Sequence, residues 1–425
     1  MRPQHRERGE HVPMEKTETP NAAKNHEITL WQMALELLKI GAMGFGGGMA
    51  VIALMETDCV KKRSCVEVDD FLHGVGLGQI LGPFAVNAAI FIGCRMFGLL
   101  GGLIGAVSFL LPSIVLVIIL SWLYVTFHHI PSLQGALVGL GPVVIALILS
   151  AAWSMGRKKM QSVVGAVIAA ATCLAGVLHL NPVWTLLGAG LAGLALKLGA
   201  PQDQKPGKPG TQPGILAAGA TVKIPAPAAS PPAVAGPLSG GALGLAGAAG
   251  LLYLGWIFFK VGLVFFGGGF VLIPVLNHQL VSDLGWLTPQ QFIDGVAISQ
   301  LTPGPVAVLA TFAGYLRAGV PGALVATGAL FTPAMVLMLL LSTFYERLRT
   351  KRFAQDFLAG VEPAVIGLIV AAAITLAPGS MSLARPVSIG LGILALVLLV
   401  RFRWHPAFVL LIGAVAGIMR PGLLQ

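Results

Sequence analysis

The stretch Trp256–Pro274, WIFFKVGLVFFGGGFVLIP, is apolar enough to lie within a lipid bilayer, yet it contains Lys260 and three consecutive glycines. A glycine inside a helix costs about 0.5–1 kcal/mol relative to alanine. A lysine at the centre of a bilayer costs about 2.5–3.5 kcal/mol on insertion scales. Residues that are this unfavourable in hydrocarbon indicate a functional site inside a membrane segment.

Composition indicates that most of the chain lies in the lipid bilayer. Of its 425 residues, 56% are hydrophobic and only 10% are charged, whereas about 25% are charged in soluble proteins. Apolar runs of about 20 residues recur from residue 30 onward, which predicts an all-α polytopic membrane protein. The net charge of +10 is carried by short loops between these runs, so it does not indicate a nucleic-acid partner.

The sequence contains none of the common catalytic motifs. It has no P-loop, no HExxH, no GxSxG and no paired metal ligands, so we expect neither an enzyme nor a bound cofactor. Its four cysteines form no CxxC pair and no disulfide framework. Secondary transport is therefore favoured over transport driven by ATP within this chain.

The second half of the chain repeats the first at an offset of 221 positions. This offset pairs Lys39 with Lys260, Gly46–Gly48 with Gly267–Gly269, Gln79 with Gln300, and Pro112 with Pro333. A register that holds over about 100 residues predicts two homologous halves.

Four segments follow from the repeat and from composition. A polar, charge-balanced tail without a signal peptide occupies residues 1–29. The first membrane domain is expected at 30–199 and the second at 241–425. The segment 200–240 between them is rich in Pro, Gly and Ala, which predicts a flexible linker.

Basic charge alternates between matched loops of the two halves. Loop 57–70 contains three basic residues, whereas its counterpart 278–291 contains no lysine or arginine. The next pair reverses this pattern, because 126–133 has none and its counterpart near 347–352 has four. Two further loop pairs alternate in the same way. By the positive-inside rule the halves are inverted relative to each other, an arrangement typical of secondary transporters.

The same rule predicts that one apolar segment in each half does not cross the bilayer. Loops 57–70 and 126–133 should lie on opposite sides, yet two apolar segments, 71–95 and 99–125, lie between them. We favour 71–95 and its counterpart as re-entrant hairpins, because Gly82-Pro83 and Pro303-Gly304-Pro305 split them into pieces of about 16 Å, half a bilayer. The alternative is a kinked crossing helix there, with 99–125 re-entrant at Pro112. Each half would then have about five crossing helices and one re-entrant half-helix hairpin.

A re-entrant hairpin predicts an anion site near the membrane midplane. The second half-helix would begin there, with a positive partial charge and unpaired N–H groups. Consecutive glycines allow backbone N–H groups to approach a ligand, and each lysine lies two turns before its glycines. The candidate substrate-binding residues are Lys39, Gly46, Gly47, Gly48, Gln79, Asn87, Lys260, Gly267, Gly268, Gly269, Gln300, Thr302, Pro303, Gly304 and Pro305.

Each of these features also has a purely structural explanation. The glycines allow close helix packing in membranes, and the glutamines can join helices by hydrogen bonds. Lys39 can pair with Glu36 or extend its ammonium group towards the membrane surface. Asp69, Asp70 and His73, like Asp294, lie at the mouths of the hairpins. We expect solvated helix caps there, with proton coupling as the alternative.

Four stretches carry a resemblance to a known family. GFGGG at 44–48, FGGGFVLIP at 266–274, GWLTPQQFIDGVAISQLTPGPV at 285–306 and RAGVPGALVATGALFTP at 317–333 resemble the two-domain form of the chromate ion transporter (CHR) family. The resemblance extends over nearly all of the chain beyond residue 30. The first half departs from the family pattern at Gly48, where a proline is usual, and at 79–83, which has one proline fewer.

The resemblance implies a multi-pass carrier of the cell inner membrane that exports chromate and confers chromate resistance. Its implied partners are chromate and the lipid bilayer, with a homodimer as a further expectation. One alternative is a carrier for sulfate or another tetrahedral oxyanion, because sulfate has the shape and charge of chromate. Another is an anion channel. A third alternative is a membrane sensor that signals through the linker.

Overall fold

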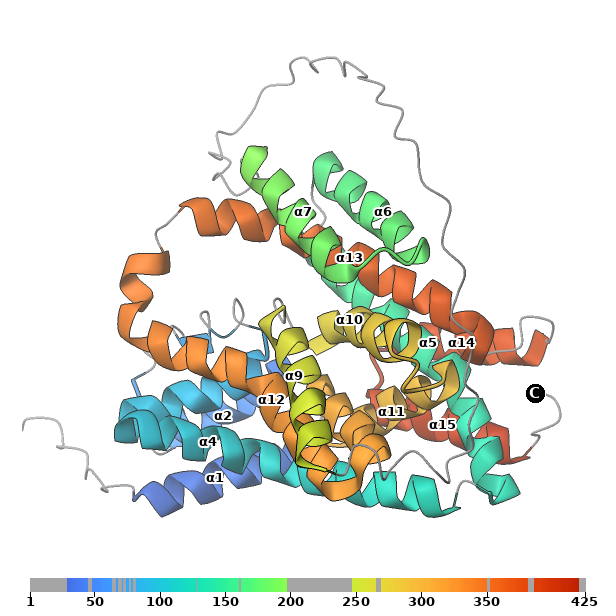
Figure 1. Ribbon diagram of the computed structural model, residues 1–425, viewed down its shortest axis with the longest axis horizontal. Coiled ribbons are helices and arrows are strands. Elements are labelled where there is room, and N and C mark those ends of the chain that lie inside the picture. Colours follow the sequence, from blue (N-terminus) through green and yellow to red (C-terminus); the bar gives the residue numbers. More distant parts are fainter. Residues whose placement is uncertain are drawn as a thin grey trace, which may run out of the picture.

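The computed structural model describes most of both halves. The described residues are 29–44, 48–62, 66, 67, 71, 74, 75, 78, 82–127, 129–159, 162–196, 247–264, 269–349, 352–380 and 386–419. Among them, every regular element is helical, as predicted, and thirteen are α-helices (Figure 1). Gly46, Gly47, Gln79, Gly267, Gly268 and the predicted linker lie outside the described residues.

The described elements of the two halves follow a similar order, with α11 and two 3₁₀ turns described in the second half alone. The first half has α1 (Leu30–Met43), α2 (Gly48–Met55) with a π-helical extension (Glu56–Lys62), α4 (Phe84–Phe127), α5 (Pro131–Lys159), α6 (Val163–Val177) and α7 (Pro182–Ala195). The second half has α9 (Ala248–Leu263), a 3₁₀ turn (Gly269–Val271), α10 (Leu272–Asn277), a π-helical segment (His278–Asp283), α11 (Pro289–Leu301), a 3₁₀ turn (Val306–Val308), α12 (Leu309–Arg349), α13 (Arg352–Ser380), α14 (Pro386–Val400) and α15 (Pro406–Met419).

Local sequence explains where α1 and α11 begin. Thr29 and Thr288 accept hydrogen bonds from the third backbone N–H of their helices, those of Gln32 and Gln291. Each glutamine side chain in turn accepts from the backbone N–H of its threonine, at 3.0 and 2.9 Å. These capping boxes satisfy N–H groups that a helix start leaves unpaired.

Equivalent contacts confirm the repeat. A Cβ atom on Gly41 of α1 would overlap the carbonyl oxygen of Phe109 in α4. In the second half, Gly262 of α9 meets the carbonyl of Leu330 in α12 in the same way. Both pairs are related by the offset of 221 positions. The repeated sequence thus builds the same close backbone packing twice.

The 44-residue α4 is two antiparallel helices, not one rod. Its backbone leaves the helical region at Phe97 and Gly98, and Gly98 has a φ of 63°. Gly93 and Gly101 on either side of this turn are in backbone contact, which requires the chain to reverse. The equivalent turn in α12 lies at Ala318 and Gly319. The boundary expected between segments 71–95 and 99–125 lies at the first of these turns.

A second reversal lies at each predicted break. Gly74 lies against the ring of Phe91, so the segments before and after Gly82-Pro83 run side by side in opposite directions. Gly295 of α11 lies in the same way against Phe312 of α12. The chain therefore reverses at both breaks. Helix α4 continues through Pro112 with helical backbone angles.

The last two helices of each half pack on the other half. Helices α6 and α7 lie along α13, and α14 and α15 lie along α5 (Figure 1). The Thr172 hydroxyl of α6 donates to the Ala364 carbonyl oxygen of α13 at 3.1 Å. Backbones also touch where Gly139 of α5 meets Gly413 of α15. This exchange joins the halves into one core, while α4 lies against α12 and α5 against α13.

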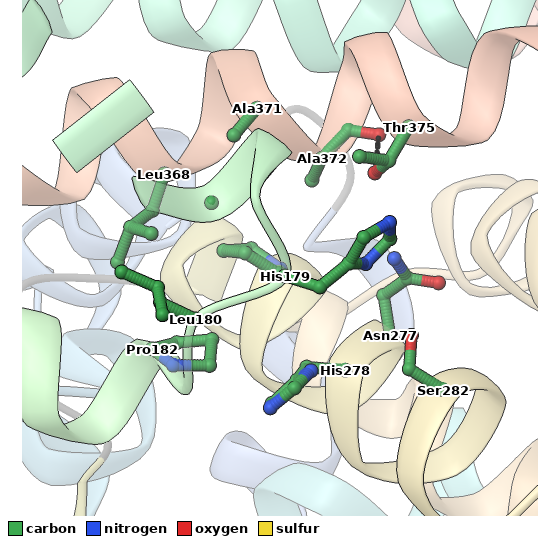
Figure 2. A pocket seen from close by; sticks show the side chains of 12 residues that line it. His179, Leu180, Pro182, Asn277, His278, Ser282, Leu368, Ala371, Ala372 and Thr375 are labelled. Carbon is green, nitrogen blue, oxygen red and sulfur yellow. Dashed lines mark hydrogen bonds between the residues drawn. The ribbon is translucent and has the colours of Figure 1, made fainter. Parts of the chain in front are cut away.

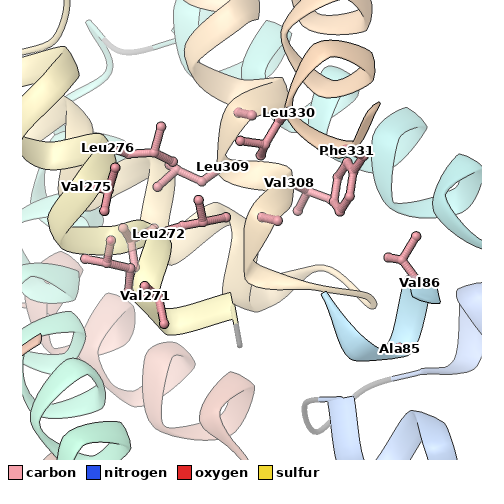
Figure 3. Packing of buried hydrophobic residues seen from close by; sticks show 14 of the residues in the cluster. Ala85, Val86, Val271, Leu272, Val275, Leu276, Val308, Leu309, Leu330 and Phe331 are labelled. Carbon is pink, nitrogen blue, oxygen red and sulfur yellow. The ribbon is translucent and has the colours of Figure 1, made fainter. Parts of the chain in front are cut away.

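Side chains next to both breaks belong to a single hydrophobic cluster. Figure 3 shows Val86 of α4, Leu272 of α10 and Phe331 of α12 within it. Four described helical spans are long and apolar enough to cross a membrane: Phe84–Phe127, Pro131–Arg157, Val306–Leu340 and Ala359–Pro378. The protein is therefore a multi-pass helical membrane protein.

Candidate substrate site at the paired helix breaks

Each break contains a glycine whose backbone conformation side-chain-bearing residues rarely adopt. Gly82 has a φ of 105° and Gly304 a φ of 111°. These values lie beyond even the left-handed helical region, near φ of about 50–70°, that asparagine and aspartate enter. Glycine at these two positions is therefore required by the backbone path.

The structure corrects how the two breaks correspond. The offset of 221 positions pairs Gly82 with Pro303, but the glycines with matching conformation, Gly82 and Gly304, are 222 apart. The register then returns to 221 at Gly98 and Gly319. The 3₁₀ turn Val306–Val308 accounts for the return, because three 3₁₀ residues rise about 6 Å, as do four α-helical residues.

The second-half break contacts the first half directly. The backbone N–H of Gly304 donates to the carbonyl oxygen of Gly44, the residue at which α1 ends, at 3.2 Å. The Ser113 hydroxyl of α4 donates to the carbonyl oxygen of Pro303. Gly269, at the end of the second glycine motif, lies beside Val306. The described ends of both glycine motifs thus meet at this break.

Both glycine motifs fall between helices. Helix α1 ends at Met43 and α2 begins at Gly48, while α9 ends at Leu263 and the next turn begins at Gly269. Interrupted helices of this kind leave backbone N–H and C=O groups without intrahelical partners. Such groups are available to a ligand or to another part of the chain, as Gly44 illustrates.

Two predicted side chains have buried polar atoms without a hydrogen-bond partner. The Nε2 of Gln300, at the end of α11, is a buried donor that no described residue accepts from. Asn87 is completely buried, and its Nδ2 donates to the carbonyl oxygen of Gly78 at 3.4 Å, while its Oδ1 has no partner. Buried polar atoms are usually paired in folded proteins, so these two atoms are candidate ligand contacts. Thr302 differs, because its hydroxyl donates to the Ser299 carbonyl oxygen at 3.0 Å.

The two lysines lie apart from these residues. Lys39 and Lys260 are exposed, while their neighbours Ile40 and Val261 face the protein interior. The expected common face with the glycines requires a continuous helix over seven residues. Because α1 and α9 end before the glycines, that relation is lost. Lys260 lies in the last turn of α9, where a cation is favoured by the helix dipole.

The expectation of a solvated cap at Asp294 is wrong. This side chain is 1% exposed, and Thr288 is the residue that caps α11. Its Oδ2 accepts a hydrogen bond from the Tyr124 hydroxyl at 2.9 Å, and its Oδ1 accepts one from the Gln290 amide at 2.8 Å. Tyr124 is 170 residues away in sequence, so no local pattern revealed this contact.

A small hollow lies elsewhere, between the α6–α7 turn, α10 and α13. Figure 2 shows the imidazole of His179 and the amide of Asn277 turned towards each other across it. His179 closes α6 with a φ of 57°, where glycine is usual. The Nε2 of His278 lies 3.5 Å from the Oδ1 of Asp283. Burial lowers the pKa of His278, the nearby His179 lowers it further, and Asp283 partly opposes this shift.

None of the predicted substrate-binding residues lines this hollow. The candidate substrate site is therefore the meeting point of the two glycine motifs and the second-half break. Of the described residues, it includes Gly44, Gly269 and Gly304, and Gln300, whose buried Nε2 has no partner, lies four residues before Gly304 in the sequence.

The fold and these breaks define a membrane transporter built from two repeated halves. The family model for the chromate transporter matches residues 31–194 and 252–418. The chain belongs to this chromate transporter family.

Curated relatives match this chain over most of their own length. The chain is 33% identical over 384 residues to the chromate transport protein of Cupriavidus metallidurans, which covers 88% of this chain and 89% of that protein. It is 29% identical over 396 residues to the probable chromate transport protein of Synechococcus elongatus, covering 92% and 95%. The uncharacterized transporter YwrA of Bacillus subtilis is 30% identical over 169 residues, which are 39% of this chain but 94% of that protein. No solved structure matches this chain.

Proposed function

We propose that this protein is a secondary carrier that transports chromate across the cell inner membrane, outward, and thereby confers chromate resistance. The observation that supports the proposal is the hydrogen bond from Gly304 to Gly44, which joins the first glycine motif to the second-half break in a protein of the chromate transporter family. The relative from Cupriavidus metallidurans, which this chain matches over 89% of its length, is a chromate transport protein.

The oxyanion would bind to backbone N–H groups at the breaks and to the free amide of Gln300. Asn87 and Thr302, with Pro303, Gly304 and Pro305, would shape the site. Gly48 and Gly269 begin the elements that follow the glycine motifs, and Gly46, Gly47, Gln79, Gly267 and Gly268 complete the proposal outside the described residues. Lys39 and Lys260, being exposed, would supply cationic steps on the flanks and no direct contact.

Electrostatics favours export of a dianion. Moving one charge across 100 mV is worth about 2.3 kcal/mol, so two charges give about 4.6 kcal/mol when the cell interior is negative. Binding energy in the site has to replace the hydration of the ion, which isolated charges in hydrocarbon lose at great cost. Backbone N–H groups and a neutral amide can do so without placing an unpaired cation in the membrane.

We also propose inverted halves with re-entrant hairpins. The 13 residues of α11 span about 20 Å, which is short of the roughly 30 Å hydrocarbon core. The reciprocal packing of α6 and α7 on α13, and of α14 and α15 on α5, supports a two-fold relation between the halves. Cysteine labelling in a cysteine-free variant should find positions near Lys62 and Lys351 on the same, cytoplasmic side. Labelling from opposite sides would refute the inversion.

The remaining proposals concern boundaries and assembly. Membrane domains at 30–199 and 241–425, joined by a linker at 200–240, agree with the two segments that the family model matches. Removal of part of this linker should leave transport intact. A homodimer is expected in detergent, and its mass is measurable by light scattering; a monomer with full transport activity would exclude the need for it.

Uptake of labelled chromate into inside-out vesicles tests the proposed function. We expect saturable uptake that requires the protein and that an equal concentration of sulfate reduces only slightly. Sulfate that displaces chromate at equal concentration would favour the sulfate carrier. Uptake that rises linearly with concentration would indicate an anion channel.

A further inference from the structure

Asp294 is a carboxyl group buried between the two halves. It lies on α11 and is 1% exposed. Its two oxygens accept hydrogen bonds from Tyr124 of α4 and from Gln290, one helical turn earlier. Among the described residues, no lysine, arginine or histidine forms an ion pair with it. A buried carboxylate without a cation is costly, so its ionised form depends on these two donors.

Tyr124 is the titratable side chain that contacts this carboxyl group. Helices α5, α12, α13 and α15 also pack against α11, but none of their described residues makes a hydrogen bond or an ion pair with Asp294. The Tyr124 ring instead stacks edge-on against Phe312 of α12, with the ring centroids 5.4 Å apart. Few other charged groups therefore influence how readily Asp294 binds or releases a proton.

The position of Asp294 connects it to the candidate substrate site. Gln300 lies six residues further along α11, about 9 Å along the helix axis. Phe312, which contacts Tyr124, follows the break on the other arm and lies against Gly295. Asp294 on α11 and Phe312 on α12, the two arms of the second-half break, are therefore joined through Tyr124. The charge on Asp294 acts on the candidate substrate site through the protein interior, where the dielectric constant is low.

We propose that Asp294 binds a proton that travels together with the oxyanion. This inference rests on the proposed function. An ionised Asp294 repels a dianion near Gln300, whereas a protonated Asp294 does not, so each ligand favours binding of the other. On binding, one proton from water joins the carboxylate; on release at the other side, it returns to water. One dianion and one proton then move per cycle, with a net charge of minus one.

Substitution of Asp294 by asparagine imitates the protonated state. In proteoliposomes containing the full chain, we measure exchange and net uptake of labelled chromate between pH 6.5 and 8.5, and proton movement during net uptake with an enclosed pH dye. For the wild type, the half-saturation concentration should rise about tenfold over this range, a typical coupling between two ligands. For Asp294→Asn it should stay at the low-pH value, with exchange retained and proton movement lost. Because chromate itself takes up a proton in this range, variants are compared at each pH.

Three further variants distinguish coupling from folding. Asp294→Glu keeps a carboxyl group and should keep coupled proton movement. Tyr124→Phe removes a donor to the ionised form and should keep coupling while moving the pH dependence to higher pH. Asp283→Asn alters a carboxylate of the preceding segment that is 39% exposed, and should behave as the wild type.

The outcomes separate this inference from the proposed function. If the half-saturation concentration of Asp294→Asn still depends on pH as that of the wild type does, or if this variant still moves protons, the role of Asp294 is overturned. Equal loss of exchange in the asparagine and glutamate variants would assign Asp294 to the fold and overturn it as well. A wild type that shows net uptake of chromate without moving protons would overturn the inference alone. A wild type without exchange would overturn the proposed function and, with it, this inference.

Discussion

The two halves build the same break from different residues. In the first half a single proline follows Gly82, and α4 begins at once. In the second half Gly304 lies between two prolines, and a 3₁₀ turn precedes α12. Both solutions place a glycine of the same conformation before an equivalent helical arm. The comparison teaches that the backbone path is the repeated feature, while the sequence that produces it is free to vary.

The side chains around the breaks differ more than the backbones do. Ser113, which bonds the second-half break, matches Ala334 by the repeat offset, and the buried Asn87 matches Val308. Asp294 matches His73, whose structure lies outside the described residues. A symmetric scaffold therefore surrounds an asymmetric set of polar groups. Such a site can bind an ion in one defined orientation, and each half should contribute unequally.

The largest expected effect is that of replacing the break glycines. At Gly304, alanine would have to adopt a φ of 111°, and its Cβ would overlap the Ser113 hydroxyl. Left-handed backbone angles alone cost a non-glycine residue about 1–2 kcal/mol, and overpacking adds about 1–3 kcal/mol. We expect Gly304→Ala to reduce chromate uptake by more than about tenfold. Gly82→Ala should reduce it less, and equal losses would show that backbone conformation alone matters.

Gly319→Ala is the matched control for these two variants. Gly319 has a φ of 59°, within the left-handed helical region, and nothing lies within 4 Å of the added Cβ. It should lose about 1 kcal/mol of stability and keep nearly full uptake. Uptake as poor as that of Gly304→Ala would mean that the turn between the arms of α12 matters as much as the break.

The next effect distinguishes two neighbouring polar residues of the second half. Gln300→Leu removes a buried donor without a partner, so it should raise the half-saturation concentration for chromate about tenfold and leave stability unchanged. Thr302→Val removes a hydroxyl that already bonds Ser299. It should cost about 1 kcal/mol of stability and leave half-saturation unchanged. Uptake kinetics and thermal unfolding in detergent measure both quantities, and the opposite pattern would move the anion site towards Thr302.

The sequence predicts features that neighbouring residues determine, and it does not predict contacts between residues far apart in the chain. Breaks at Gly82-Pro83 and at Pro303–Pro305 were predictable because proline and glycine act on their own backbone. The turn at Gly98 falls at the boundary expected between the apolar segments 71–95 and 99–125, but the backbone contact between its two arms was not predicted. The exchange of helix pairs and the contact of Tyr124 with Asp294 depend on residues far apart in the chain. No periodicity in the sequence reports such distances.

The exchange of helix pairs between the halves allows the contribution of each pair to stability to be compared. Gly360 of α13 is in backbone contact with Ala189 of α7, and Gly139 of α5 with Gly413 of α15. Alanine at either glycine forces helices apart, at a cost of about 1–3 kcal/mol. We expect Gly139→Ala and Gly360→Ala to lower the unfolding temperature equally. Gly188→Ala, with nothing within 4 Å of its Cβ, should be neutral or slightly stabilising. Clearly unequal effects would show that the two exchanged pairs are not equivalent.

The smallest expected effect is a pH dependence confined to the second half. Burial lowers the pKa of His278 below its ordinary value of 6.5, whereas the matched residue of the first half, Thr57, does not titrate. Between the lowered pKa and about 6.5, the unfolded chain binds more protons than the folded chain. Stability therefore rises with pH through this window and is lost as pH falls through it. Lowering the pH from 7.5 to 5.5 should reduce the unfolding temperature of the wild type by about 1–2 °C more than that of His278→Gln. Equal reductions in the wild type and in His278→Gln would mean that another group is responsible for the acid sensitivity. Thr57→Val, the matched change in the first half, should show the same pH dependence as the wild type.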